Sequence, residues 1–532
     1  MSDRDEGGYR RYRAPQADGQ TLIDPPAGEL PAQVAANRQA IVGGQAAHPA
    51  GFDPAFVIAA RQELLGLAHR FTSSFCDVPA PPANAGSLPL VLSGHQPDLF
   101  HTGVWFKNFL LDRLAKAVGG CGVHVLIDSD LCRTTGVRSP IGSIEKPGVQ
   151  TVLYDEVAEA CPWEVRPVQS HEALDSFAAR AADALNGLVD EPLAASMQSD
   201  LTQAARAGVR LGEALSRARR LVEGRWGLAN LELPLSAVCE TEAFAAFAAM
   251  VVTRIEDFVH AYNGALDAYR TAHRLRTPAQ PLPDLKSDDP WTETPLWVWT
   301  DEAPIRRPAF VRHREDDWVL SDRSGGEWSL GPDATGIAEL ARQGVRLRSR
   351  ALFTTLYGRL VLGDLFLHGI GGAKYDHVTD DLARRFFGAA PPPHATVSAT
   401  LRLPIDFPMP APGADADSKR RLRDLWFHPE RHLDADNPAT AELIAAKLNA
   451  VREPPRENGS NLARHRQIEQ ANAALREAIS AERVALQARR EQLLSQQRAE
   501  SILGSREYSL CLFPEPWLRE QMQEIAGAAL PR

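Results

Sequence analysis

One stretch constrains the fold of this chain more than any other: LPLVLSGHQPDLFHTGVWFKN, from Leu88 to Asn108. A short apolar run comes first, a polar turn follows, and an amphipathic helical pattern begins at about Gly103. This order is typical of a βα unit, in which ligands meet the carboxyl end of the strand and the free N–H groups of the helix start. His95 and His101 lie in the turn, so we expect a ligand site there.

A second unit of the same kind follows the first. Glycines at 119, 120 and 122 end the first helix, and Val123 to Ile127 forms the next expected strand. Two such units predict a Rossmann-like parallel sheet, which the segment from Val149 to Tyr154 would extend. Asp128 follows the second strand, where a carboxylate commonly binds a ribose hydroxyl, a substrate amine or a metal. A role as a helix cap or turn residue is an equal alternative for Asp128 and the favoured one for Asp130.

Length and composition limit the class of protein. A chain of 532 residues exceeds the usual size of one hydrophobic core, so we expect two or more domains. The net charge of -10 argues against a general nucleic-acid or membrane binder. Six scattered cysteines form no C-x-x-C pair and fit reduced thiols, and the N-terminus has no apolar signal segment. We therefore expect a cytoplasmic protein without a membrane span.

The order of segments predicts an α/β protein: a Rossmann-like core, an insertion with helices and a small β-sheet, and a C-terminal helical coiled-coil arm. The expected parts are a flexible N-terminal extension (1–50), the first part of the core (51–170), the helical and antiparallel β insertion (171–345), the second part of the core (346–435), the arm (436–510) and a C-terminal tail (511–532). An extension held in place by Tyr9 and Tyr12 is the less favoured alternative. One long helix is expected from Glu240 to Leu275. Heptad-like spacing in the arm favours a coiled coil that would pair two copies of the chain, through Ile468, Leu475, Ile479, Leu486 and Leu493.

The turn after the first strand has the residue types of an anion site. Thr102 and Gly103 would offer backbone N–H groups at the helix start, and Lys107 would neutralise a phosphate. His95 and His101 would add hydrogen bonds or transfer protons near neutral pH. The structural alternative is that these polar groups satisfy the loop backbone and that Lys107 is a solvated side chain. Because several polar types meet where this fold class places its sites, the ligand interpretation is favoured.

A second polar segment, HGIGGAKYDH, begins at His368 after a strand-like run from Leu365. Its glycines would permit positive φ and close approach of the backbone to a ligand, its lysine would hold a phosphate, and its tyrosine and aspartate would bind a polar substrate or transfer protons. A GxGG pattern alone indicates only a tight turn before a helix, expected here from Tyr375 to Phe387. The residues expected to take part are Gly369, Gly371, Gly372, Lys374, Tyr375, Asp376 and His377.

The two segments together resemble a known family. The order of strand, GHQPDLFHTG, a helix with Lys107 and LIDSD is similar to the opening of the bacillithiol biosynthesis cysteine-adding enzymes, and RALFTTLYGRLVLGDLFLHGIGGAKYD resembles their second core segment. His95 stands where that family usually has Gln, and Ala373 with Lys374 stands where it has an acidic residue. The resemblance implies a Rossmann-like core, a coiled-coil arm that mediates dimerisation, and an activity that joins the amine of an amino sugar conjugate to cysteine. It also implies a pocket lined by Gly94, His95, Gln96, Gly103, Lys107, Gly371, Gly372 and Tyr375.

The leading hypothesis is an enzyme of ligase or transferase type that binds a nucleotide such as ATP or ADP, or a phosphorylated small molecule, with no metal. Its expected catalytic residues are His95, His101, Tyr375 and Asp376. Its expected binding residues are Gly94, Gln96, Thr102, Gly103, Lys107, Asp128, Gly369, Gly371, Gly372, Lys374 and His377. The alternative is a non-catalytic scaffold with a degenerate core and a dimerising arm. A metal-dependent hydrolase is a third interpretation, with His428 and His432 as minority ligands.

Overall fold

The computed structural model describes residues 3–4, 10–43, 48, 50–277, 280–409, 413–453 and 461–531. The chain divides into two compact units, which we describe separately. Unit 1 comprises Met1–Ser139, Gln150–Leu403 and Arg506–Arg532, and unit 2 comprises Pro140–Val149 and Pro404–Ser505.

Unit 1 contains a six-stranded sheet in the order β10-β5-β4-β17-β18-β3. The first five strands are parallel, and β3 runs antiparallel at the edge. The chain passes from β4 to β5 and β10 on one side and later returns to β17 on the other side of β4. In open α/β sheets such a switch point is where ligands bind. The strands are β3 Thr21–Asp24, β4 Leu90–His95, β5 Cys121–Leu126, β10 Leu231–Pro234, β17 Leu365–His368 and β18 Ala395–Ala399.

The helices of unit 1 confirm the α/β class. Of these, α3 packs on the strands of the sheet, and α17 packs against α3. Their bounds are α1 Leu30–Val42, α2 Pro54–Ser73, α3 Thr102–Ala117, α4 His171–Asp175, α5 Phe177–Ala184, α6 Leu193–Arg206, α7 Leu211–Arg225, α8 Leu235–Val238, α9 Glu242–Val252, α10 Ile255–Ala272, α11 Ala351–Tyr357, α12 Ile370–Phe387 and α17 Glu515–Ala529.

Alternation along the strands separates an apolar face of the sheet from a face that also buries polar and charged side chains. Successive side chains of a strand point to opposite faces, so every second residue shares a face. On one face the strand residues join the hydrophobic core formed with α2, α9 and α10. Burial of each such side chain contributes roughly 1.5–3 kcal/mol, so this face fixes the register of the strands. The strand residues concerned are Leu90, Leu92, Val123, Val125, Leu231 and Leu233.

The opposite face holds a buried charged network. Glu223 Oε1 accepts hydrogen bonds from Trp105 Nε1 at 2.6 Å, Asn108 Nδ2 at 2.8 Å and Arg219 Nη1 at 2.6 Å. Arg219 Nη2 also donates to Glu232 Oε1 at 2.7 Å. Burial raises the pKa of Glu232 to about 7, although the nearby Arg219 opposes this shift. One cation therefore serves two buried acids beneath α3.

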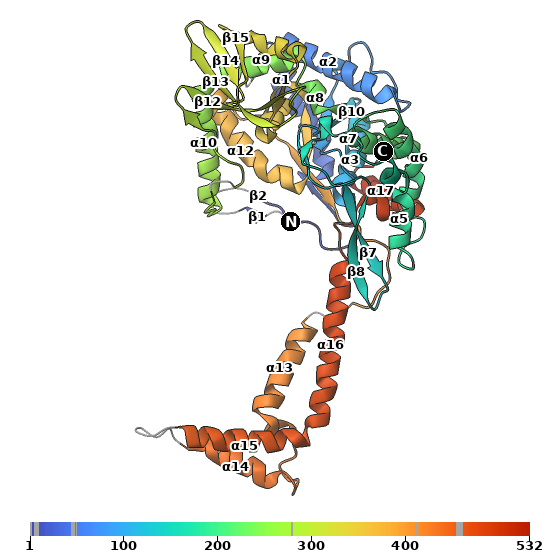
Figure 1. Cartoon of the computed structure of the whole chain (residues 1–532), viewed down its shortest axis with the longest axis vertical. Coiled ribbons are helices and arrows are strands. Elements are labelled where there is room, and N and C mark those ends of the chain that lie inside the picture. Colours follow the sequence, from blue (N-terminus) through green and yellow to red (C-terminus); the bar gives the residue numbers. More distant parts are fainter. Residues whose placement is uncertain are drawn as a thin grey trace. The chain divides into compact units, whose positions relative to one another are not determined.

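A second, antiparallel sheet lies between β10 and β17 in the sequence, as expected for the insertion. Its order is β11-β12-β13-β14-β15, and β16 pairs with β12 on another edge. Figure 1 shows β12 to β15 together beside α9 and α10. The strands are β11 Ser287–Asp288, β12 Trp291–Thr300, β13 Arg307–Arg314, β14 Asp317–Ser321, β15 Glu327–Gly331 and β16 Val345–Ser349.

The expected flexible N-terminal extension and the expected C-terminal tail both contain packed elements. Within the expected flexible extension, β3 pairs with β18, and Tyr12 is buried against Leu22 and Ala373. The alternative of an extension held by Tyr12 is therefore correct for this residue, whereas Tyr9 lies outside the described residues. The expected C-terminal tail contains α17, whose apolar face packs on α3.

Three expected elements differ in the structure. Val149 to Tyr154 does not extend the main sheet, because β8 (Pro147–Leu153) pairs only with β7 (Gly136–Gly142) in a separate two-stranded sheet (Figure 1). The expected long helix Glu240 to Leu275 is two helices, α9 and α10. The range 171–345 is not one insertion, because β10 belongs to the main sheet.

Unit 2 is helical apart from residues 140–149. Its α13 packs along α16, and its α14 packs along α15. The expected heptad is interrupted, since α15 ends at Ala478 and Leu475 and Ile479 are the buried members. The helices are α13 Ala414–Phe427, α14 Ala441–Arg452, α15 Leu462–Ala478 and α16 Ser480–Leu503.

Candidate functional site

A cavity of about 540 Å³ in unit 1 lies at the carboxyl ends of β4, β5 and β17. Gly94, His95 and Gln96 reach it from the end of β4, and His368 and Gly369 from the end of β17. The two polar segments singled out in the sequence, 270 residues apart, therefore line one cavity at the switch point of the sheet.

Lys107 and His95 form the floor of this cavity. Lys107 is 1% exposed, and its Nζ donates to the carbonyl of Gly94 at 2.7 Å. Burial and the charge of Arg219 lower the pKa of Lys107 to about 7. Burial and the charge of Lys107 lower the pKa of His95 to about 3, so its imidazole is neutral at physiological pH. The alternative of a solvated Lys107 is wrong, because helix α3 directs the side chain inward.

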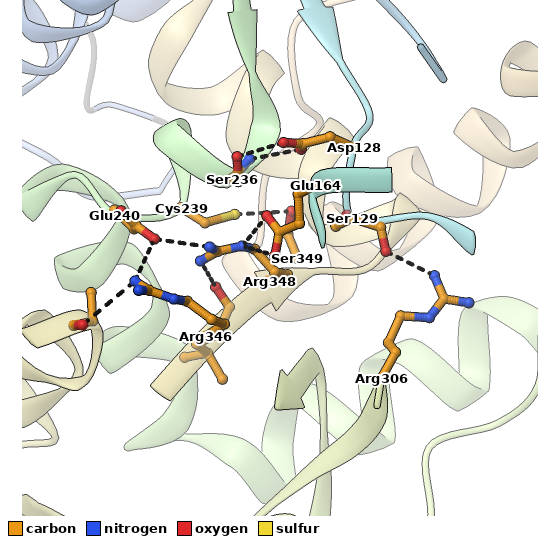
Figure 2. Close-up of polar contacts among 12 residues, drawn as sticks. Asp128, Ser129, Glu164, Ser236, Cys239, Glu240, Arg306, Arg346, Arg348 and Ser349 are labelled. Carbon is orange, nitrogen blue, oxygen red and sulfur yellow. Dashed lines mark hydrogen bonds and ion pairs between the residues drawn. The ribbon is translucent and has the colours of Figure 1, made fainter. Parts of the chain in front are cut away.

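Asp130, not Asp128, is the carboxylate at the cavity. Gln96 Nε2 donates to Asp130 Oδ2 at 3.0 Å, and Arg306 Nη1 donates to Oδ1 at 3.0 Å. Burial alone would raise the pKa of Asp130, but the hydrogen bond from Gln96 and the Arg306 guanidinium hold it below its usual value. Arg306 also donates to the carbonyl of Ser129 at 3.1 Å (Figure 2). Asp130 is thus an ionised group with a fixed orientation.

The structure gives Asp128 a structural role. Its Oδ1 accepts the backbone N–H of Ser236 at 2.9 Å and its Oδ2 accepts the Ser236 hydroxyl at 2.5 Å (Figure 2). Burial raises the pKa of Asp128 against these hydrogen bonds. Asp128 is not among the residues that line the cavity, and its bonds to Ser236 in the first turn of α8 support the structural alternative, whereas its binding role stays a prediction.

The start of α3 is closed to ligands. The side chain of His101 caps the helix, with Nδ1 accepting the N–H of Gly103 at 3.1 Å. A side chain at Gly103 would collide with the Ala399 carbonyl and the Arg506 guanidinium, and the buried Thr102 hydroxyl faces the Leu401 carbonyl. None of these three residues of the first turn lines the cavity. These contacts give His101 a capping role; the anion site at this helix start and a catalytic His101 stay predictions.

The glycine-rich segment is the first turn of α12 rather than a loop. The helix begins at Ile370, five residues before the expected start, and its N-cap Gly369 has φ of -75°. Gly369, Gly371 and Gly372 line the cavity, but none has a positive φ. Their expected role in a left-handed turn is wrong; they instead keep the cavity wall at the helix start free of side chains.

The polar side chains of α12 separate into two groups. Tyr375 is 37% exposed and lines the cavity. Lys374 is exposed and, like Asp376 and His377, does not line it. The cavity therefore gives no support to the phosphate role of Lys374 or to binding by His377, which stay predictions.

Asp376 instead orients His368. His368 Nε2 lies 2.9 Å, His394 Nδ1 3.2 Å and Arg359 Nη1 2.8 Å from the same oxygen, Asp376 Oδ2. Burial opposes the charge of this carboxylate, but Arg359 and the two imidazoles hold the pKa of Asp376 well below its usual range. The His368 ring stacks on Phe366 with a centroid distance of 4.4 Å.

The second sheet contributes a cationic wall that the sequence did not predict. Arg350 and Arg306 lie 4.0 and 4.5 Å from the ring centroid of Trp297, and all three residues line the cavity. Arg350 Nη2 donates to Glu293 at 2.7 Å, which fixes its position. Isolated arginines at strand ends carry no motif, so no local signal could have identified this wall.

Arg348 joins the second sheet to the segment that follows β5. It donates to Glu164 at 2.9 Å and to Glu240 at 2.8 Å (Figure 2). Burial raises the pKa of Glu164 to about 7 against the charge of Arg348. The contacts of Arg348 hold the end of β16, where Ser349 and the following residue, Arg350, line the cavity.

Among the described residues, no group of three or more His, Cys, Asp or Glu is placed to hold a metal ion. A helix with the length and apolarity needed to cross a membrane is likewise not found in the described part of the chain. Comparison of the sequence with protein-family models and with curated proteins found no match.

Proposed function

We propose that this protein is an enzyme of ligase or transferase type that binds an anionic small molecule, a nucleotide or another phosphorylated compound, in the cavity of unit 1. One observation carries the proposal: His95 at the end of β4, His368 at the end of β17 and Lys107 on α3 line one cavity. The parallel order and the switch point support a Rossmann-like core, for which this is the usual ligand position.

The cavity offers two sources of anion recognition. Arg306 and Arg350 lie on the wall from the second sheet. The backbone N–H groups at the start of α12 lie beside Gly371, and no side chain caps this helix. A helix N-terminus favours negative charge, and arginine binds phosphate with a planar fork. We therefore place the phosphate-binding position at the start of α12 rather than at the start of α3, where the sequence predicted it.

The reacting end of the substrate would lie over the floor. A lysine with a pKa of about 7 exchanges its proton readily near neutral pH, and a neutral imidazole at His95 can donate or accept a hydrogen bond without carrying charge. Asp130 would hold a substrate amine through its ionised carboxylate. This arrangement fits the resemblance to the cysteine-adding enzymes, whose activity joins the amine of an amino sugar conjugate to cysteine.

Calorimetric titration with ATP, ADP, AMP and inorganic phosphate tests the proposal. At least one of these probes is expected to bind, and Arg306→Gln is expected to weaken it about tenfold or more, since a hydrogen bond to a charged group contributes about 1.5–3 kcal/mol. Arg307→Gln is the matched control, because the neighbouring arginine does not line the cavity. Absence of binding by all four probes, or equal weakening by both variants, would refute the proposal.

We also propose that unit 2 pairs two copies of the chain, as the expected coiled coil would. Its helices expose large apolar side chains, including Phe427 at 47% and Val484 at 60%. Multi-angle light scattering is expected to show a dimer that the double substitution Phe427→Ser, Val484→Ser weakens. Val157→Ser is the control, because Val157 is 77% exposed in unit 1. A monomeric wild-type protein would contradict this proposal and remove the support for the scaffold alternative.

A further inference from the structure

His368 has the environment of a proton-transfer residue, a role that the sequence analysis did not assign to it. It is the last paired residue of β17 and lines the cavity, and its Nε2 lies 2.9 Å from Asp376 Oδ2. A base whose ring is oriented by a buried carboxylate is the arrangement that catalytic histidines commonly show. We propose that His368 is a catalytic residue of this cavity and that Asp376 is its positioning residue; the proposal rests on the function proposed above.

The distances indicate which ring nitrogen lies next to the carboxylate. Asp376 is an ionised acceptor held by Arg359 at 2.8 Å and lies 2.9 Å from Nε2 of His368, so the proposal assigns the proton to Nε2 and the lone pair to Nδ1. A Cβ built on Gly372 would lie 2.8 Å from His368 Nδ1, so Nδ1 lies beside a residue that lines the cavity.

As an N–H or O–H group of one substrate attacks the carbonyl or phosphoryl centre of the other, its nitrogen or oxygen bonds to that centre and its proton passes to Nδ1. The imidazolium remains paired with the Asp376 carboxylate. The bond between that centre and the leaving group then breaks, and the leaving group takes the proton from Nδ1. The charged and titratable groups around this pair are Arg359 before β17, Asp380 on α12 and His394 before β18, and His377 lies near Asp380 and His394.

His394 shows that contact with Asp376 does not by itself make a catalytic residue. It lies 3.2 Å from the same Asp376 oxygen, but it does not line the cavity. His394 is therefore the internal control for His368. Gly371 is the control for Gly372, since a Cβ at Gly371 would meet nothing within 4 Å in the same helical turn.

The test uses the ligand-free protein and does not depend on the substrate. In ¹⁵N spectra of histidine-labelled protein, assigned with His368→Gln, His368 is expected as the tautomer protonated at Nε2. Asp376→Asn is expected to give a mixture of tautomers. The opposite tautomer in the wild type would overturn the proposal.

A second measurement holds even if Asp376→Asn fails to fold. Diethyl pyrocarbonate modifies bare imidazole nitrogens, and mass spectrometry of peptides containing His368 gives the rate. Gly372→Ala is expected to slow modification about tenfold, as a steric barrier of about 1.4 kcal/mol does, whereas Gly371→Ala leaves it unchanged. Equal rates in the two variants would overturn the assignment of Nδ1 to the cavity. Loss of nucleotide binding with these results intact would instead refute only the proposed function.

Discussion

Replacement of Lys107 by methionine separates the physical consequences of a buried amine from any chemistry it performs. Methionine fills a similar volume but has no charge, so the variant retains the packing of α3. The variant also loses the hydrogen bond from Lys107 to the Gly94 carbonyl. The free energy lost with this bond does not change with pH over the range in which the lysine is neutral. The pH dependence of stability is therefore the quantity to compare.

The magnitude follows from the pKa of Lys107, which falls from 10.5 to about 7 in the folded protein because of burial and the charge of Arg219. Between these values the unfolded chain holds a proton that the folded protein has released. The free energy of unfolding of the wild type should therefore rise with pH across this window, at up to about 1.4 kcal/mol per pH unit. Relative to Lys107→Met, the gain between pH 7 and pH 9 is about 2 kcal/mol. Glu164 and Glu232 are common to both proteins, so their titration cancels in the difference.

Urea unfolding of both proteins at pH 7, 8 and 9 measures this difference, and ¹³C NMR of the lysine Cε reports the titration directly. Lys374→Met is the control: Lys374 is exposed on α12, and its substitution is expected to change stability equally at each pH. A wild-type minus Lys107→Met difference that is independent of pH would refute the conclusion that Lys107 loses its charge near neutrality. It would also remove Lys107 as a proton-transfer group.

Three further substitutions test the structural assignments. His101→Ala should lower the free energy of unfolding by about 1 kcal/mol through loss of the α3 cap and leave nucleotide affinity unchanged, which urea unfolding and calorimetry would show. A loss of affinity would restore His101 to the site. Gly103→Ala should lower Tm by several degrees in scanning calorimetry, because the methyl collides with a carbonyl of β18; an unaltered Tm would contradict this packing. Arg219→Met should cost about 3–5 kcal/mol in urea unfolding, since Glu223 and Glu232 lose their shared cation, and a neutral effect would contradict the network.

The local pattern of the sequence was sufficient for the elements that hold the site. The sequence changes from strand periodicity at Leu90–Leu92 to helical periodicity in the segment that ends at Ala117. The strand expected from Leu365 is β17, Leu365–His368. Apolar periodicity determines these elements because each must bury one face. That the segments at His95 and at Gly371 line one pocket was an expectation from the family resemblance, not from periodicity.

Side-chain direction at the ends of the strands required the tertiary structure. Asp128 and Asp130 are two residues apart and chemically identical, yet Ser236 binds one and the cavity receives the other. The backbone around them is fixed by hydrogen bonds from Trp163 and Glu164 to the carbonyls of Asp130 and Asp128. Those partners lie more than 30 residues away, so no local signal distinguishes the two carboxylates.

Local sequence pattern was sufficient for the α/β class and for the strand and helix pattern around the site, because periodic burial is a local property of the chain. The tertiary structure decided which groups of the two polar segments meet. In the folded protein His101 caps α3 and Lys374 is exposed. Arg306 and Arg350 line the same cavity as Lys107. The tertiary structure also placed the carboxylate of Asp376 behind His368. These outcomes depend on contacts between residues far apart in the chain, whose geometry is set only when the sheet and the helices pack.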